Sequence, residues 1–321
     1  MNVGLGIGLG FGGRVAFPPV ISSIDIALSD PRGGDLRTLL GTTLDTATAV
    51  SIDGTPVTAF AAISATEMIV VMPALAADAS RTLTVTGPGG AGTIEVEYYS
   101  PASEALTGYW ERGNYDAQLG TWPGLASAGA SGGRDLTQST AGYRPSETNL
   151  EPVFDGVDDR LGSSLAVDSF VAGGAGTVFV VYEPASLAAA ADNPYDDPAL
   201  VGIAGQYGLL QVNTDGARAS LYDGAYRQAT ITAPAGTMHA ATLKWNGTNG
   251  YLSVDGSAFT SFTCSTVLLL SGGALRIGAN WDASKKFNGA IRAIALIDTA
   301  LSDATCAKLL LWARSSHGVA A

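Results

Sequence analysis

The stretch Val153-Phe154-Asp155-Gly156-Val157-Asp158-Asp159 decides the fold of the larger part of this chain. It leads from apolar residues through the turn dipeptide Asp155-Gly156 to two further carboxylates. Asp-Gly pairs favour tight turns, because glycine accepts positive φ and the aspartate oxygen accepts hydrogen bonds from nearby backbone N–H groups. The stretch therefore predicts a strand, a tight turn and the start of a second strand.

Short strands and tight turns recur through the rest of the chain. The turn dipeptides that join alternating runs as hairpins are Asp215-Gly216, Asp223-Gly224, Asn246-Gly247 and Asp255-Gly256. Residues 177–182 form an apolar, β-branched run, which is typical of a strand covered on both faces. Ser302 is a predicted N-cap of a final short helix that stops at Gly318. These patterns indicate an all-β fold closed by one helix.

Length, composition and charge narrow the class of protein. The 321 residues are too many for one small domain, and 41 glycines with only 14% charged residues indicate many short strands. The net charge of -12 comes without a basic stripe, so the counterion release that drives nucleic-acid binding is missing. We expect at least two β domains and no nucleic-acid partner.

The N-terminal part is a small domain made of short alternating runs. These runs are residues 20–26, 49–52, 66–71 and 82–86, with turn formers between them. The segment resembles the IPT/TIG module through Pro19, Ile21, Ile24, Gly33, Gly34, Leu36, Gly41, Val50, Gly54, Phe60, Ser64, Thr66, Ile69, Val71 and Pro73. Residues 27–32 depart from that pattern, because they lack its proline-rich approach to the glycine pair. The resemblance implies an Ig-like β-sandwich over residues 18–99.

Residues 106–321 carry a second resemblance, on three spaced signals and the final helix. The signals are residues 153–159, residues 243–256 and residues 275–291. Together they resemble a laminin-G/concanavalin A-like domain, which implies a larger jelly-roll sandwich with a short C-terminal helix. Such sandwiches usually bind glycans or proteins, and only some are enzymes. The polar residues 100–105 are the predicted linker between the two domains.

The first residues alternate large apolar side chains with glycine. The apolar positions are Val3, Leu5, Ile7, Leu9 and Phe11. Such a segment has no second face with which to bury its own apolar row, so it is either a disordered tail or an arm docked on a neighbouring subunit. We expect residues 1–17 to be an anchoring arm in a homo-oligomer. The chain shows no secretory leader and no apolar run long enough to span a bilayer, so no membrane insertion is expected.

Catalytic residues are not apparent in the sequence. Glycan hydrolases of the concanavalin type carry carboxylates at alternate positions of one strand. Glu95-Val96-Glu97 is the only such pair of glutamates, and it lies in the N-terminal module. The glutamates of the larger domain, which form no such pair, are Glu104, Glu111, Glu147, Glu151 and Glu183. We therefore expect that the protein is not an enzyme.

Two groups of residues are candidates for binding. Asp155, Asp158 and Asp159 could hold calcium, although a tight turn followed by a solvated strand start explains them more simply. No other cofactor is expected. Aromatic and polar side chains on loops are typical of glycan sites, although the same residues could serve packing. The glycan candidates are Asn280, Trp281, Asp282, Tyr222 and Tyr226.

Cys264 and Cys306 are the only cysteines. Two thiols do not make a disulfide scaffold, and both cysteines lie in runs that read as strand or helix. We expect two buried thiols, and a single disulfide is the alternative.

The order of arm, IPT/TIG-like module and laminin-G-like module resembles a virion surface protein of a tailed bacteriophage. This resemblance implies a non-enzymatic structural protein, either a capsid decoration protein of the head or a tail or fibre component. It would contact other virion proteins through its arm and host-surface glycans or proteins through its larger domain. It would be made in the host cytoplasm and lie on the virion surface. The alternatives are a bacterial cell-surface or secreted adhesin and a polysaccharide-degrading enzyme.

Overall fold

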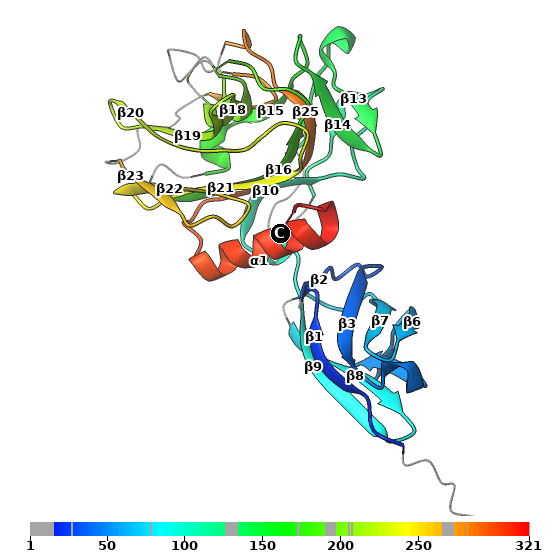
Figure 1. Ribbon diagram of the computed structural model, residues 1–321. Helices are drawn as coiled ribbons and strands as arrows, with labels where there is room; N and C mark the ends of the chain where they lie inside the picture. Colours follow the sequence, from blue (N-terminus) through cyan, green and yellow to red (C-terminus); the bar gives the residue numbers. More distant parts are fainter. Residues whose placement is uncertain are drawn as a thin grey trace, which may run out of the picture. The chain divides into compact units, whose positions relative to one another are not determined.

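The computed structural model describes residues 16–26, 28–77, 79–125, 134–171, 174–189, 197–204, 206, 208–264, 273–280 and 282–320 (Figure 1). The chain divides into two compact units, Met1–Tyr98 and Tyr99–Ala321. Strands are the main regular elements of both units, so the predicted all-β class is confirmed. The apolar row of the predicted arm, from Val3 to Phe11, lies outside the described residues.

The N-terminal unit is a sandwich of two sheets. The first sheet has the order β1 (Val20–Ile24), β3 (Leu36–Thr42), β7 (Glu67–Val71) and β6 (Ala59–Ser64). The second has the order β2 (Leu28–Ser29), β9 (Gly90–Tyr98), β8 (Ala79–Gly87), β4 (Ala49–Ile52) and β5 (Thr55–Pro56), and a short 3-10 turn covers Leu44–Thr46. Because strand side chains alternate, Met68 and Val70 of β7 enter the core, which also holds Leu39, Val85 and Val96.

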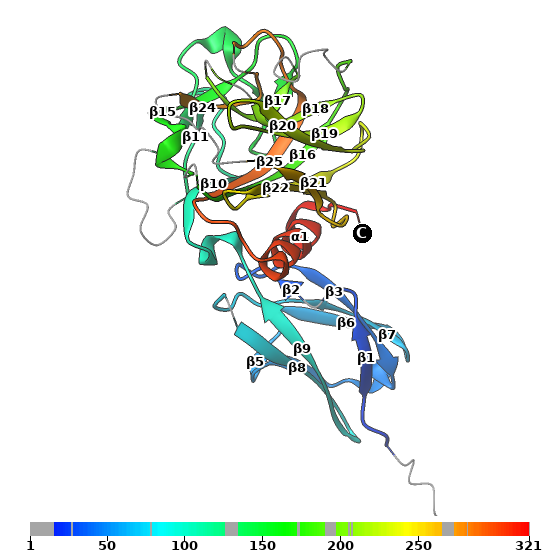
Figure 2. The same ribbon diagram turned by 90° about the vertical axis from the view of Figure 1, so that its left-hand side faces the viewer.

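The C-terminal unit is a larger sandwich of two eight-stranded sheets, stacked face to face (Figure 2). The first sheet runs β13 (Ser146–Thr148), β14 (Glu151–Asp155), β25 (Asn288–Ile297), β16 (Gly176–Pro184), β21 (His239–Trp245), β22 (Asn249–Val254) and β23 (Thr260–Thr263), with β10 (Leu106–Glu111) also paired to β25. The second runs β11 (Thr121–Trp122), β12 (Leu136–Thr137), β15 (Leu161–Ala166), β24 (Ala274–Ile277), β17 (Ala199–Ile203), β18 (Gly208–Asn213), β19 (Gly216–Tyr222) and β20 (Tyr226–Ile231). Short 3-10 turns cover Pro101–Ser103, Ala141–Tyr143 and Val167–Ser169.

Aliphatic side chains and several large aromatic rings fill the core between these two sheets. Trp110, Trp122 and Trp245 are fully buried there. On β16, Val180 faces this core, whereas the Phe179 ring lies 6.4 Å from the ring of Trp312 in the C-terminal helix. The prediction of a strand covered on both faces is therefore confirmed.

The C-terminal helix α1 (Asp303–His317) begins and ends where the sequence predicts. Ser302 is its N-cap, because the Ser302 hydroxyl accepts a hydrogen bond of 3.1 Å from the Thr305 N–H. Gly318 ends it in the left-handed conformation, with φ of 77°. At the same end, Arg292 donates a hydrogen bond of 2.9 Å to the His317 carbonyl, and a cation at a helix C-terminus is stabilising.

Both cysteines are free and buried, so the prediction of two buried thiols is confirmed. Burial raises the pKa of the Cys306 thiol to about 11, which keeps it protonated and unreactive at neutral pH. In the part of the chain that the structure describes, no helix is both long and apolar enough to cross a membrane.

The segment predicted as a plain linker, residues 100–105, contains a regular turn. Pro101 begins the 3-10 turn because its fixed φ suits the first helical position, and the Ser100 hydroxyl accepts a hydrogen bond from the Ala102 N–H. The Tyr99 hydroxyl donates to the Glu104 carboxylate over 3.2 Å. The turn thus has local order that its polar composition did not indicate.

Candidate functional site

Two loops that are distant in sequence meet at one end of the C-terminal sandwich. Asp155, the last residue of β14, lies opposite Asn288, the first residue of β25. The loop that precedes β25 folds back on itself through a bridge between Ala279 and Lys286. The pairing of β14 with β25 thus brings the Asp155 turn next to the loop that holds Asn280 and Asp282.

Asp155 forms the tight turn that the sequence predicts. Its Oδ1 accepts hydrogen bonds from the N–H groups of Val157 (2.7 Å) and Asp158 (3.3 Å). Slight burial opposes ionisation of Asp155, but these hydrogen bonds outweigh it and lower the pKa of the carboxyl group. The Asp155 N–H in turn donates to Asp159 Oδ2 over 2.9 Å. Burial raises the pKa of Asp159 to about 6.

The same three carboxylates are also the predicted calcium ligands. One oxygen from each of Asp155, Asp158 and Asp159 lies within 4.8 Å of the others. Calcium takes six to eight oxygens, and Asp155 and Asp159 already accept hydrogen bonds from the turn. The turn accounts for their positions, and calcium binding stays a prediction.

A small cavity of about 160 Å³ opens beside this turn, and we call it the rim pocket. Polar residues line it from three segments: Asp155 from the turn, Ser186 from the loop after β16, and Lys286 and Asn288 from the start of β25 and the residues before it. Asn288 Nδ2 donates to Ser186 Oγ over 2.7 Å. Leu187 and Phe287 add apolar surface. The pocket therefore combines hydrogen-bond donors, acceptors and an apolar wall.

The loop that holds Lys286 contains a lysine with a lowered pKa and a strained backbone residue. Burial lowers the pKa of Lys286, and repulsion from Arg160 and Arg276 lowers it further. Its ammonium group donates to the carbonyl of Ala283. Ala283 has φ of 62°, a left-handed conformation that a residue with a Cβ rarely adopts. Such strain is often found where a loop is held in a particular shape for binding.

The predicted glycan residues in this loop differ in their availability. Asn280 is buried, and its amide is committed to the loop: Oδ1 accepts from the Lys285 N–H and Nδ2 donates to Ser284 Oγ. Asp282 is exposed. Slight burial works against its ionisation, but hydrogen bonds from Ser284 prevail and lower its pKa. Trp281 lies outside the described residues.

The other two predicted glycan residues lie elsewhere, on the hairpin of β19 and β20. The rings of Tyr222 and Tyr226 are 4.7 Å apart, and both rings pack against the core between the sheets. In the same hairpin, the Asp223 carboxylate forms an ion pair with Arg227. The structure does not bring this hairpin to the rim pocket, and it uses the two tyrosines largely for packing.

Sequence reasoning missed Ser186, Lys286 and Asn288. Asn288 lies within one of the stretches that indicated the fold, but a single sequence does not show that β25 pairs with β14. A buried polar cluster was missed for the same reason. In it, Asp197 Oδ2 accepts from Asn213 Nδ2 (2.8 Å) and from Arg218 Nη1 (2.5 Å).

Comparison with known families identifies both sandwiches. Residues 19–99 match the IPT/TIG domain, and residues 187–307 match a family described as the concanavalin A-like lectin/glucanases superfamily. No match was found among the curated proteins.

Solved structures with a similar fold come from several kinds of protein. Trypanosoma rangeli sialidase aligns with 72% of this chain and 42% of its own, at 13% identity and a TM-score of 0.47. Domain 4 of AbnA, a GH43 extracellular arabinanase from Geobacillus stearothermophilus solved with arabinotriose, aligns with 64% of this chain and 98% of its own, at 12% identity and a TM-score of 0.41. The ligand-binding domain of botulinum neurotoxin serotype D, solved with N-acetylneuraminic acid, aligns with 65% and 51%, at 11% identity and 0.41. The chain spans less than half the length of the sialidases, and these similarities concern the fold alone.

The prediction that this protein is not an enzyme is wrong. It rested on the missing pair of alternate carboxylates in the larger domain. Sialidases and an arabinanase nevertheless appear among the structures that resemble this chain. At these low identities they do not establish enzymatic activity either.

The two family matches and the two sandwiches agree in position along the chain. The chain therefore carries an IPT/TIG domain with an Ig-like fold, followed by a lectin-like, concanavalin A-like sandwich.

Proposed function

We propose that the C-terminal unit is a carbohydrate-binding domain and that the rim pocket holds one sugar unit. The observation that carries the proposal is the set of residues that lines this pocket: Asp155, Ser186, Lys286 and Asn288 beside apolar residues. The match of residues 187–307 to a lectin and glucanase superfamily supports the same class of ligand.

The chemistry of the pocket suits a sugar. A sugar hydroxyl both donates and accepts hydrogen bonds, so its site needs groups of both kinds. Asp155 accepts, Lys286 donates and the Asn288 amide does both. The lowered pKa of Asp155 keeps its carboxylate ionised near neutral pH, and hydrogen bonds to ionised groups are the stronger ones. The small volume of the pocket favours a terminal sugar unit over an extended chain.

Calorimetric titration of the full-length chain with a glycan that it binds tests this site. Asn288→Ala removes the amide, and we expect a loss of affinity of about tenfold, equal to about 1.4 kcal/mol. Asn114→Ala is the matched control, because Asn114 is exposed and does not line the pocket. Equal affinities for the wild type and Asn288→Ala would remove the rim pocket from the proposal.

We further propose that the protein displays this domain on the surface of a phage particle. The glycine-alternating arm and the order of the two modules support this role. The Ig-like unit offers an additional contact surface, because every residue of its edge strand β6 is exposed, including Phe60 and Ile63. Unprotected strand edges readily pair with other chains. Many copies on one particle would turn weak sugar contacts into strong attachment.

Deletion of residues 2–13 tests the anchoring role of the arm. We expect the truncated protein to fold normally but to be absent from purified particles. Incorporation at the wild-type level would contradict the anchor. Recovery of the native protein in a bacterial membrane or medium fraction would favour the adhesin alternative, and release of reducing sugar from a glycan panel would reveal hydrolysis.

A further inference from the structure

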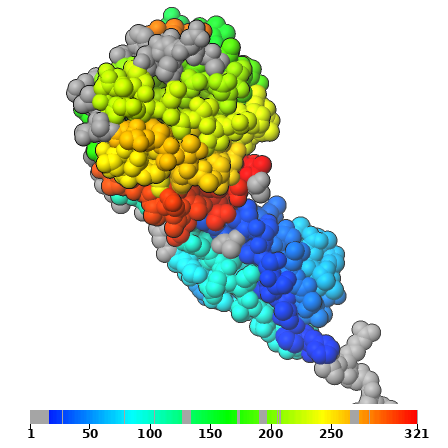
Figure 3. Space-filling model, turned by 60° about the vertical axis from the view of Figure 1, so that its left-hand side comes forward, coloured from blue at the N-terminus to red at the C-terminus, as the bar shows by residue number. Residues whose placement is uncertain are grey.

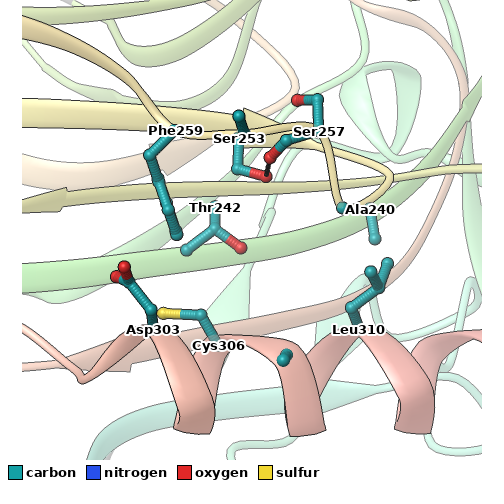
Figure 4. Close-up of a pocket in the computed structure, with 11 residues that line it drawn as sticks. Ala240, Thr242, Ser253, Ser257, Phe259, Asp303, Cys306 and Leu310 are labelled. Atoms are coloured by element: carbon teal, nitrogen blue, oxygen red, sulfur yellow. Dashed lines mark hydrogen bonds between the residues drawn. The ribbon is translucent and has the colours of Figure 1, made fainter.

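A second, larger hollow lies on the outer face of the first sheet of the C-terminal unit. Alternate residues of β21 enter the core between the sheets, so Thr242 and Lys244 point outward. Helix α1 runs along this face, and Figure 4 shows Thr242, Ser253 and Phe259 on the strand side of the hollow. On the opposite side the same view shows Asp303, Cys306 and Leu310 of the helix. At the surface, the helix adjoins the strands drawn in yellow and orange (Figure 3).

Two cavities make up this hollow. One, of about 470 Å³, lies between α1 and the strands β21 and β22. The other, of about 490 Å³, is lined by Lys244, Asn246, Tyr251 and Ser261, and both cavities share Phe259 and Asp303. We call the two together the α1 groove. It is several times larger than the rim pocket, so it suits an oligosaccharide rather than a single sugar.

Two aromatic residues line the α1 groove. Tyr251 and Phe259 meet edge to face, with ring centroids 6.5 Å apart and an interplanar angle of 87°. Both are only partly buried. Exposed ring surface inside a cavity can bury the apolar face of a sugar, while Asn246 and Ser261 offer hydrogen bonds to its hydroxyls. This mixture of rings and polar groups is what a saccharide site requires.

The charge of the groove selects among saccharides. Of the described residues that line it, Lys244 alone is cationic. Its ammonium group contacts the Asp303 carboxylate, donates to the Leu301 carbonyl over 2.9 Å and lies 4.5 Å from the centre of the Phe259 ring. The Lys244 side chain is only 9% exposed, whereas that of Asp303 is 79% exposed. An entering ligand therefore meets the Asp303 carboxylate rather than the Lys244 ammonium group. The net charge of the protein, -12, is negative as well.

From this arrangement we propose that the α1 groove is a second saccharide site, that it takes an uncharged oligosaccharide, and that Asp303 sets this preference. The proposal goes beyond the function assigned to the rim pocket, because it uses other residues and another part of the sheet. Tyr251 and Phe259 would bury the apolar side of the sugar rings. Asp303 would accept a hydrogen bond from a sugar hydroxyl and repel acidic sugars.

Calorimetric titration of the full-length protein with neutral trisaccharides of glucose, mannose and galactose, and with their uronic-acid counterparts, tests the site. We expect a neutral trisaccharide to bind, and Phe259→Ala to weaken it about tenfold. Phe60→Ala is the matched control, since Phe60 is a partly exposed phenylalanine of the N-terminal unit and should leave binding unchanged. Thermal unfolding of each variant checks that it folds.

The outcomes separate the two sites. If Phe259→Ala still binds the neutral trisaccharide and Asn288→Ala does not, the proposed saccharide site in the α1 groove is wrong. The proposal for the rim pocket would then remain. Binding of none of the trisaccharides would overturn the α1 groove, whereas the rim pocket is judged separately, with glycans found on an array.

Asp303→Asn tests the charge preference by itself. Asparagine keeps the shape of the side chain and removes the charge, so Lys244 becomes an uncompensated cation. We expect the ratio of neutral to acidic trisaccharide affinity to fall at least fivefold, and to fall less in 0.5 M salt than in dilute buffer, because salt screens charge. A wild type that prefers the uronic acids, or a ratio that Asp303→Asn leaves unchanged, would overturn the role of Asp303.

Discussion

Asp155 at the end of β14 lies opposite Asn288 at the start of β25, although the two are far apart in the sequence. This pairing joins a tight turn to the first residue of a central strand and creates the rim pocket between them. Asp155 therefore has two roles: it holds its turn by accepting hydrogen bonds from the N–H groups of Val157 and Asp158, and it is one of the residues that line the pocket.

Asp155→Ala should remove both roles. Two backbone N–H groups lose their acceptor, which we expect to cost about 1 to 2 kcal/mol of the free energy of unfolding. Urea unfolding measures this loss. Asp158→Ala is the control, since Asp158 takes part in the turn through its backbone N–H, which the substitution keeps. Equal stability of Asp155→Ala and the wild type would show that the turn does not depend on this carboxylate.

Asp159 should make the folded protein less stable as pH rises from about 4 to 6. Its pKa is about 6 in the folded state, above the unfolded value of about 3.9, so the folded protein binds the proton more tightly. The contribution of Asp159 is therefore largest below about pH 4 and is lost as pH rises towards 6. We expect a loss of about 1 kcal/mol after allowance for solvent screening. Urea midpoints at pH 4 to 7 should fall less in Asp159→Asn, and identical profiles would contradict the raised pKa.

Asp197→Ala should be among the most destabilising substitutions in the C-terminal unit. It leaves Arg218, whose side chain is 9% exposed, without its buried partner at 2.5 Å. Breaking a buried pair on one side typically costs about 3 to 5 kcal/mol. Asp215→Ala is the control, since Asp215 is 60% exposed and 3.6 Å from Arg218, and it should cost about 1 kcal/mol or less. Similar unfolding midpoints for the two variants would contradict this assignment.

Ser302→Ala should weaken the start of helix α1. The substitution removes the acceptor for the Thr305 N–H and should cost about 1 kcal/mol. Ser302→Asp, which keeps an acceptor at the N-cap, should restore most of that stability. Thermal unfolding of the three proteins checks the order, and an aspartate variant no more stable than the alanine variant would argue against capping.

Local patterns in the sequence predicted several elements closely. The turn at Asp155-Gly156, both ends of helix α1 and the doubly covered strand β16 depend on short-range chemistry, and the structure confirms each. Strand β9 was not predicted as a run of its own, because Gly90 and Gly92 disfavour a strand in isolation. Its pairing with β8 along nine residues overrides that preference.

The binding sites were harder to predict, because they depend on contacts between distant strands. The pairing of β14 with β25 supplies Asn288, and the packing of α1 on the sheet places Asp303 beside Lys244. Neither contact leaves a short-range signal. Asn280 shows the same dependence on the fold, because its residue type suits a sugar while its amide makes hydrogen bonds within its own loop.

A glycan array probed with the full-length protein tests the central claim most directly. The account predicts binding to a restricted set of glycans, a reduced signal in Asn288→Ala and an unchanged signal in Asn114→Ala. Absence of binding across the array, or equal signals from all three proteins, would contradict the assignment of the rim pocket as a carbohydrate site.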